Sequence, residues 1–160
     1  MALVDYFMKI DGVAGESMDA KHRDEIQVLA FRWAEKSPRD VATGQAHGRI
    51  HMDPFKVTMN VNKASPKLFL MCAQGTVSPK IIFTARKAGA GQQDYLRLTL
   101  LQACVSDFEL ESEEDTDQLP TNRLEFTFRQ MEIEYLQQKA DGTLSGPIKG
   151  KFNLDEMQSK

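Results

Sequence analysis

Hydrophobic and polar residues alternate along most of this chain, and in three places the alternation shifts by one residue. Between residues 55 and 62 the alternation is regular, as in a strand with one buried face. The phase changes near residues 29, 101 and 129. Because a one-residue shift turns every later side chain to the opposite face of a flat strand, each shift has two solutions. Either the strand bends through a bulge or corner, or both faces are buried, one of them by another subunit.

Three bends in 160 residues favour a strongly curved sheet. We therefore predict a mainly β fold: an antiparallel β-barrel of two packed sheets with one flanking α-helix at about residues 65–74. Ser65 is a suitable N-cap, Pro66 suits the first helical position and Gly75 is a typical terminator. The helix is apolar on nearly all sides, so we expect it to be largely buried at one end of the barrel. Residues 88–91 and 140–142 are predicted to be hairpin turns.

The length fits one domain, which we expect to span residues 1–160. The first residues lack the basic stretch, apolar run and cleavage site of a secretory signal. We therefore expect a cytoplasmic protein, unless a dedicated machine exports it. The longest apolar run, Leu68–Ala73, is too short to span a membrane, so no membrane partner is expected. Cys72 and Cys104 are predicted to be reduced, buried thiols.

The charge is unevenly distributed. The chain has 20 basic and 23 acidic residues, a net charge of −3, which argues against nucleic acid as a partner. Seven of the acidic residues lie between Asp107 and Asp117, a segment with no basic residue. Without them, 16 acidic residues would face 20 basic ones. One predicted acidic loop therefore accounts for the overall negative charge.

The motifs of catalysis and of metal binding are incomplete. Gly15-Glu16-Ser17 lacks the second glycine of a nucleophile elbow. The glycines at 89 and 91 precede another strand, whereas a phosphate site needs a helix. His47 and His51 have the spacing of metal ligands on a helix but lead into a strand, and the acidic segment lacks the residue order of a calcium loop. We expect no enzymatic activity, no cofactor and no metal.

Several short strings occur in the same order as in one bacterial family. They are Val4–Val13, Gly15–Ser17, Asp19–His22, Asp24–Ile26, Lys63–Leu68, Cys72–Gly75, Arg86–Gly89, Gln93–Leu96 and Gln138–Gly142. Each string is weak alone, but the ordered set closely resembles the haemolysin-coregulated protein (Hcp) family, the tube subunits of bacterial type VI secretion.

The resemblance implies a β-barrel with one flanking helix, assembled into six-membered rings that stack into a hollow tube. In the family, a contractile sheath drives this tube out of the cell with a spike and effectors, some of which ride and are chaperoned inside the ring. It implies the chain itself, spike, sheath and effectors as partners, and secretion without a cleaved signal peptide. The alternatives are a phage-type tail-tube protein and a small β-barrel enzyme. Because the family-like region runs to residue 154, we expect no appended toxin domain.

Two sets of site residues follow from the resemblance and from the loop pattern. Residues 36–47 show no periodicity, and loops of that length in small domains are usually functional. In the family this loop reaches a neighbouring subunit or ring. The expected contact residues are Ser37, Pro38, Arg39, Asp40 and Val41. Arg32 lies on a strand expected to approach the lumen, where it would contact effectors; the alternative is a solvent-exposed or salt-bridged arginine.

Overall fold

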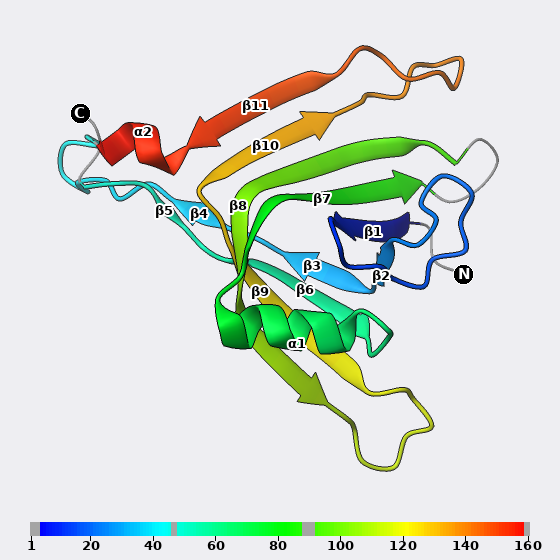
Figure 1. Cartoon of the computed structure of the whole chain (residues 1–160). Coiled ribbons are helices and arrows are strands. Elements are labelled where there is room, and N and C mark those ends of the chain that lie inside the picture. Colours follow the sequence, from blue (N-terminus) through cyan, green and yellow to red (C-terminus); the bar gives the residue numbers. More distant parts are fainter. Residues whose placement is uncertain (1–3, 46–47, 88–91, 159–160) are drawn as a thin grey trace.

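The computed structural model describes residues 4–45, 48–87 and 92–158, which form a folded-over β-structure (Figure 1). Its helices are α1 (Ser65–Gln74) and α2 (Leu154–Gln158). Its strands are β1 (Val4–Ile10), β2 (Ile26–Val28), β3 (Ala30–Arg32), β4 (Glu35–Lys36), β5 (His51–Met52), β6 (Phe55–Asn60), β7 (Val77–Lys87), β8 (Asp94–Glu111), β9 (Thr121–Thr127), β10 (Gln130–Tyr135) and β11 (Ile148–Asn153).

The main sheet is antiparallel and runs in the order β2-β1-β7-β8-β9-β6-β3, while β10 and β11 extend from another part of β8. It folds over so that the layer with β1 and β7 faces the layer with β6 and β9 (Figure 1). The ends of the path, β2 and β3, are joined through Leu29. The predicted two-layer, mainly β fold is confirmed, with one difference. The sheet is not a closed barrel, because β2 and β3 follow each other in the chain but do not pair with each other.

All three shifts of the alternation are bends of the chain. At Leu29 the chain passes from β2 to β3, that is, from one layer to the other. At Gln102 the backbone of β8 has a φ of 51°, and the buried positions change from Leu98 and Leu100 to Ala103 and Val105. Near residue 129 the chain passes from β9 to β10. The bend at Gln102 buries the apolar residues on both of its sides, whereas after residue 129 only Met131 is buried and Ile133 and Tyr135 stay partly exposed.

Aromatic side chains from both layers meet in the middle of the core. The rings of Phe31 and Phe83 lie 4.6 Å apart, those of Phe55 and Phe83 5.2 Å apart, and those of Tyr6 and Phe31 5.3 Å apart. Phe55 and Phe83 are fully buried. Full burial of a phenylalanine side chain contributes about 1.5–3 kcal/mol, so this cluster is a main source of cohesion between the layers.

Helix α1 has the predicted bounds but differs from the prediction in two respects. Its N-cap is Ala64, without a side-chain hydrogen bond. The Ser65 hydroxyl instead donates to Asn122 Oδ1 at 2.7 Å, which ties the helix to β9. Only Ser65 and Leu68 of the helix are buried, whereas Phe69 and Leu70 are about half exposed. The expected burial of the whole helix is therefore wrong, because α1 covers the sheet with one face only.

Three smaller expectations can be compared with the structure. Cys72 and Cys104 are free thiols as predicted, but both are half-buried. The segment from Asp107 is not entirely a loop, since β8 continues to Glu111. The predicted turn at 140–142 lies between β10 and β11, with a φ of 88° at Gly142. The predicted turn at 88–91 lies outside the described residues.

Candidate assembly surface

One broad polar face covers the outside of the layer formed by β3, β6, β9 and the distal part of β8. Its inner residues, such as Phe31, Val57 and Leu124, pack into the core. Strand pairing aligns the outward residues in rows. One row is Ala30, Thr58, Arg123 and Glu109, and the next is Arg32, Lys56, Glu125 and Asp107. Because successive side chains of a strand point to opposite faces, the same alternation that builds the core builds this polar face.

The charges on this polar face are ordered from one edge to the other. Arg32 on β3 is exposed and lies directly opposite Lys56 on β6, an unfavourable pairing of like charges. Lys56 Nζ lies 3.3 Å from Glu125 Oε1, and this ion pair offsets part of the repulsion between Lys56 and Arg32. No ion pair joins Arg32 to another described residue. At the opposite edge, Asp107, Glu109 and Glu111 follow one another on β8. The face is basic along β3 and acidic along β8.

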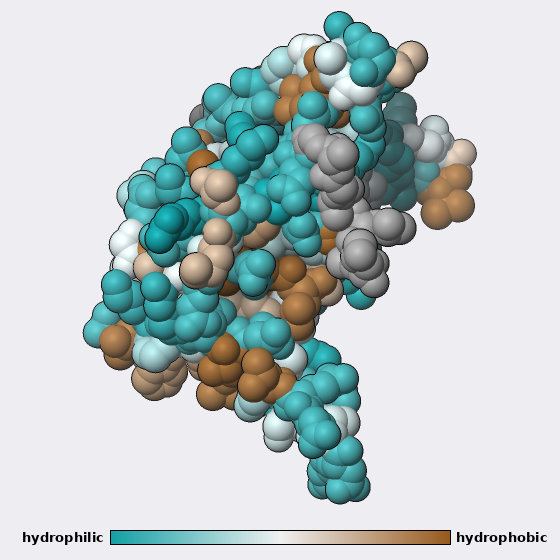
Figure 2. Space-filling view, turned by 90° about the vertical axis from the view of Figure 1, so that its right-hand side faces the viewer, coloured by the Kyte–Doolittle hydropathy of each residue, from teal (hydrophilic) through white to brown (hydrophobic). Residues whose placement is uncertain are grey.

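Both edges of this face lack a strand partner among the described residues. β3 pairs with β6 only. β8 pairs with β10 up to Leu101 and with β7 up to Cys104, and from Val105 onward β9 is its only strand partner among the described residues. The loop after β8 projects from the lower end of the molecule as a mostly hydrophilic protrusion (Figure 2). Unpaired strand edges are natural sites for contact with another chain.

The loop predicted to contact a neighbour is an exposed arm that begins with the β4–β5 pair and extends away from the two layers (Figure 1). Asp40 holds its tip, because its carboxylate accepts the N–H groups of Ala42 at 2.7 Å and Thr43 at 3.2 Å. Arg39 Nη1 donates to the Gly44 carbonyl at 3.3 Å. Ser37, Pro38 and Val41 are exposed without hydrogen-bond partners of their own among the described residues. Arg39 and Asp40 thus shape the turn that presents the other three.

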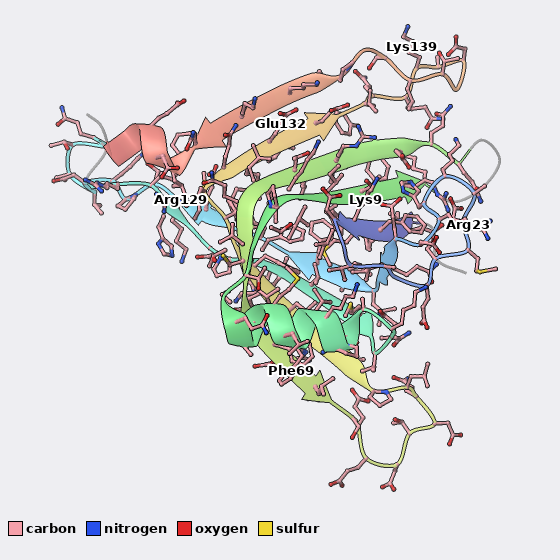
Figure 3. All side chains as sticks on the ribbon, in the orientation of Figure 1. Lys9, Arg23, Phe69, Arg129, Glu132 and Lys139 are labelled. Carbon is pink, nitrogen blue, oxygen red and sulfur yellow. The ribbon has the colours of Figure 1, made fainter. Side chains whose placement is uncertain are left out.

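The β10–β11 hairpin has two different faces. On one face, Lys149 lies within 4 Å of both Glu132 and Glu134, and Lys151 within 4 Å of Glu132, the residue labelled on β10 in Figure 3. The opposite face carries Ile133, Tyr135 and Ile148, which are 37%, 43% and 64% exposed. Ile133 lies in one row with Leu98 and Phe83 of the core. The hairpin therefore extends an apolar sheet face beyond the area that the chain itself covers.

A buried charged cluster fixes the loop between β1 and β2, and the sequence analysis did not detect it. Arg86 on β7 is 3% exposed, and its Nη1 lies 2.6 Å from Asp19 Oδ2 while Nη2 lies 3.3 Å from Asp5 Oδ2. The close contact with Arg86 holds the pKa of Asp19 below its ordinary value, against the opposing effect of burial. Burial would lower the pKa of Arg86, but the contacts with Asp19 and Asp5 outweigh it and the pKa is raised.

The same cluster includes a buried histidine. Phe7 lies between the Arg86 guanidinium, 4.8 Å from its ring centre, and the His22 ring, stacked at 4.4 Å. His22 Nδ1 is 2.7 Å from Glu25 and Nε2 is 2.9 Å from Asp94. Glu25 is only three residues from His22, but Asp94 is far from His22 in the sequence, and Asp5 and Asp19 are far from Arg86. These long-range pairs could not be found from sequence spacing. The only signal was that both residues fall in the strings Asp19–His22 and Arg86–Gly89.

The incomplete metal and nucleophile motifs of the sequence can be located among the described residues. Within residues 4–45, 48–87 and 92–158, no three His, Cys, Asp or Glu side chains gather as metal ligands would. Ser17 is buried, and its hydroxyl accepts the N–H of Asp19 at 3.3 Å. In the same part of the chain, no helix is both long and apolar enough to cross a membrane.

The chain as a whole is similar in sequence to known proteins. Residues 7–135 match the model of the family described as type VI secretion system effector, Hcp. The chain belongs to the Hcp family. It is 34% identical over 155 residues to protein hcp1 of Pseudomonas aeruginosa, covering 94% of this chain and 95% of that protein.

Solved structures agree with this placement in the Hcp family. The crystal structure of Hcp1 from Salmonella typhimurium superposes with a TM-score of 0.80 at 29% identity, over 97% of each chain. The crystal structure of a type VI secretion system effector from Yersinia pestis superposes with a TM-score of 0.76 at 29% identity, over 93% of this chain and 99% of that one. The resemblance inferred from the ordered strings is confirmed. The Hcp family consists of tube and effector proteins of type VI secretion, which indicates self-association and secretion and points away from catalysis.

Proposed function

We propose that this chain is the structural, non-catalytic subunit of a type VI inner tube, which forms six-membered rings that stack and carry or chaperone effectors in the lumen. Membership of the Hcp family over residues 7–135 is the observation that carries the proposal. Rings of identical subunits need two different surfaces on each copy, because every contact is head-to-tail. The exposed apolar face of the β10–β11 hairpin and the charged edges of the polar face supply candidate surfaces.

In this proposal the polar face of β3, β6, β9 and distal β8 lines the channel. A lumen needs a surface that stays hydrated without a subunit against it, and the outward residues of these strands are mostly polar or charged. Arg32 lies on that face and would be available to acidic effectors. The chain would fold in the cytoplasm and leave the cell through the type VI machine, with the sheath around the tube and the spike at its tip.

The first test is the mass and shape of the purified protein. We expect size-exclusion chromatography with light scattering to give six times the 18.1 kDa mass of the chain, and negative-stain microscopy to show rings with a central hole. Only monomers at high protein concentration would contradict the proposal.

The second test concerns the arm. Replacing residues 38–49 by a short glycine-rich turn should leave the subunit folded, since the tip is exposed and makes its hydrogen bonds locally, but should reduce ring stacking and secretion. The matched control shortens the β10–β11 turn at residues 139–143. If the arm variant assembles and is secreted like the unaltered protein, the arm has no contact role.

A further inference from the structure

His22 is buried on the loop between β1 and β2, and both of its ring nitrogens lie beside carboxylates. Its Nδ1 is 2.7 Å from Glu25 Oε2 on the same loop, and its Nε2 is 2.9 Å from Asp94 Oδ1 at the start of β8. A neutral imidazole has one N–H donor and one bare nitrogen that can only accept. With a neutral ring and two ionised carboxylates, one carboxylate would therefore face a lone pair at hydrogen-bond distance.

One additional proton removes this conflict. On the ring, it makes an imidazolium that donates to both carboxylates in charge-assisted hydrogen bonds. On Glu25 or Asp94, it makes a carboxyl O–H that donates to the bare nitrogen. The three groups hold the same number of protons in either arrangement. Because the side chains of His22, Glu25 and Asp94 are only 7%, 13% and 24% exposed, water is a poor substitute for the missing hydrogen bond.

The charges around the site favour the additional proton. They are the carboxylates of Asp5, Asp19, Glu25 and Asp94, and the cations of Lys21 and Arg86. The Arg86 guanidinium lies over the Phe7 ring, which also stacks on His22, but its charge already pairs with Asp5 and Asp19. The Lys21 ammonium is exposed and donates to a backbone carbonyl. Among the described residues, no lysine or arginine lies within ion-pair distance of Glu25 or Asp94.

We propose that His22, Glu25 and Asp94 form a proton-binding site that fastens the loop between β1 and β2 to the start of β8, and that loss of the proton loosens this attachment. The loop lies beside the end of β7 and the start of β8 (Figure 1). The ion pair of Asp19 with Arg86 holds it to β7 independently of this proton. Deprotonation should therefore loosen the contact with β8 while the subunit stays folded.

The bound proton fixes the direction of the pH dependence. In an unfolded chain a histidine is mostly neutral above about pH 6.5, and carboxyl groups are ionised there. The folded chain then holds up to one proton more than the unfolded chain. A state that binds more protons becomes less favoured as the pH rises, by a factor of ten per pH unit for one whole proton. We therefore expect the ratio of folded to unfolded protein to fall by up to about tenfold per pH unit above neutrality.

The decisive variant is Glu25→Gln, because the amide has nearly the same shape and can donate to the bare nitrogen of a neutral ring. Asp94→Asn makes the same change on the other side of the ring. Neither variant needs the additional proton, so both should lose this part of the pH dependence while the loop stays attached. The measurements are urea unfolding, followed by Trp33 fluorescence at fixed protein concentration, and hydrogen–deuterium exchange of residues 11–25. Both cover the range from about pH 6 to about pH 8, on either side of the ordinary histidine value.

The matched control is His51→Gln, which removes an exposed histidine whose Nε2 lies 3.1 Å from Asp53. It should keep the pH dependence of the unaltered protein. Relative to Glu25→Gln at the same pH, the unaltered protein should lose both stability and loop protection as the pH rises. Parallel stability curves for the unaltered protein and both amide variants overturn the proposal, as does loop protection that falls equally in all of them. Either result leaves the proposed tube function standing, because the site lies within one copy.

Discussion

Replacing Arg86 by methionine tests whether the buried charged cluster stabilises the subunit. Methionine keeps most of the apolar stem but removes the cation that contacts Asp19 at 2.6 Å and Asp5 at 3.3 Å. Breaking a fully buried pair costs about 3–5 kcal/mol, whereas an exposed pair contributes at most about 1 kcal/mol. The Asp19 side chain is 18% exposed and that of Asp5 39%. Since both carboxylates can recover some hydration, we expect a loss of about 2–4 kcal/mol.

The assay is urea unfolding at fixed protein concentration, followed by the fluorescence of Trp33. Arg97→Met is the matched control, because Arg97 is 43% exposed and 4.0 Å from Glu134, and it should cost less than about 1 kcal/mol. The pH dependence has a definite sign. A carboxyl group whose pKa is lowered by folding stabilises the protein fully above its ordinary value of 3.8 and loses this effect as the pH falls below it. The difference between unaltered protein and Arg86→Met should therefore shrink below pH 3.8. Equal midpoints for the two arginine variants at neutral pH would refute the reasoning.

Two further substitutions test the backbone geometry. Gln102 has a φ of 51°, which costs a non-glycine residue about 1–2 kcal/mol. Gln102→Gly should therefore be neutral or stabilising by up to about 1 kcal/mol after the entropic cost of glycine, while Gln102→Val should be destabilising in thermal unfolding. A less stable glycine variant would argue against the bend. A Cβ atom at Gly15 would lie 2.3 Å from the Glu25 carbonyl oxygen. Gly15→Ala should cost about 1–3 kcal/mol, and an unchanged melting temperature would contradict the close approach of these two segments.

The sequence was most informative where local patterns decide the structure. The alternation and its three shifts located the bends at Leu29, Gln102 and residue 129, because a buried face leaves few other arrangements. The end of α1 at Gly75 was equally readable, since glycine adopts the positive φ of a helix terminus without strain. The start of the helix was also predicted, but its N-cap was not, because the Ser65 hydroxyl donates to Asn122 and Ala64 is the N-cap.

What the sequence could not supply was pairing between distant segments. The order of charges across the polar face exists only after Arg32, Lys56, Glu125 and Asp107 are aligned by strand register. Similarly, nothing in the spacing of Arg86 indicated that it would be buried against Asp5 and Asp19. The acidic segment looked like a loop because strands are poor in Asp and Glu, yet pairing with β9 extends β8 to Glu111.

The bent strand β8 has a mechanical consequence for the proposed tube subunit. Its 18 residues pair with β7 and β10 in one layer and with β9 in the other. Sliding the layers apart would therefore pull on a continuous covalent chain and shear hydrogen bonds in both layers at once. Among the described residues, β8 is the only strand outside the β10–β11 hairpin that pairs with it, so a force on the hairpin would break these backbone hydrogen bonds one after another. Under an applied force, the β10–β11 hairpin should therefore detach from β8 before the two layers separate.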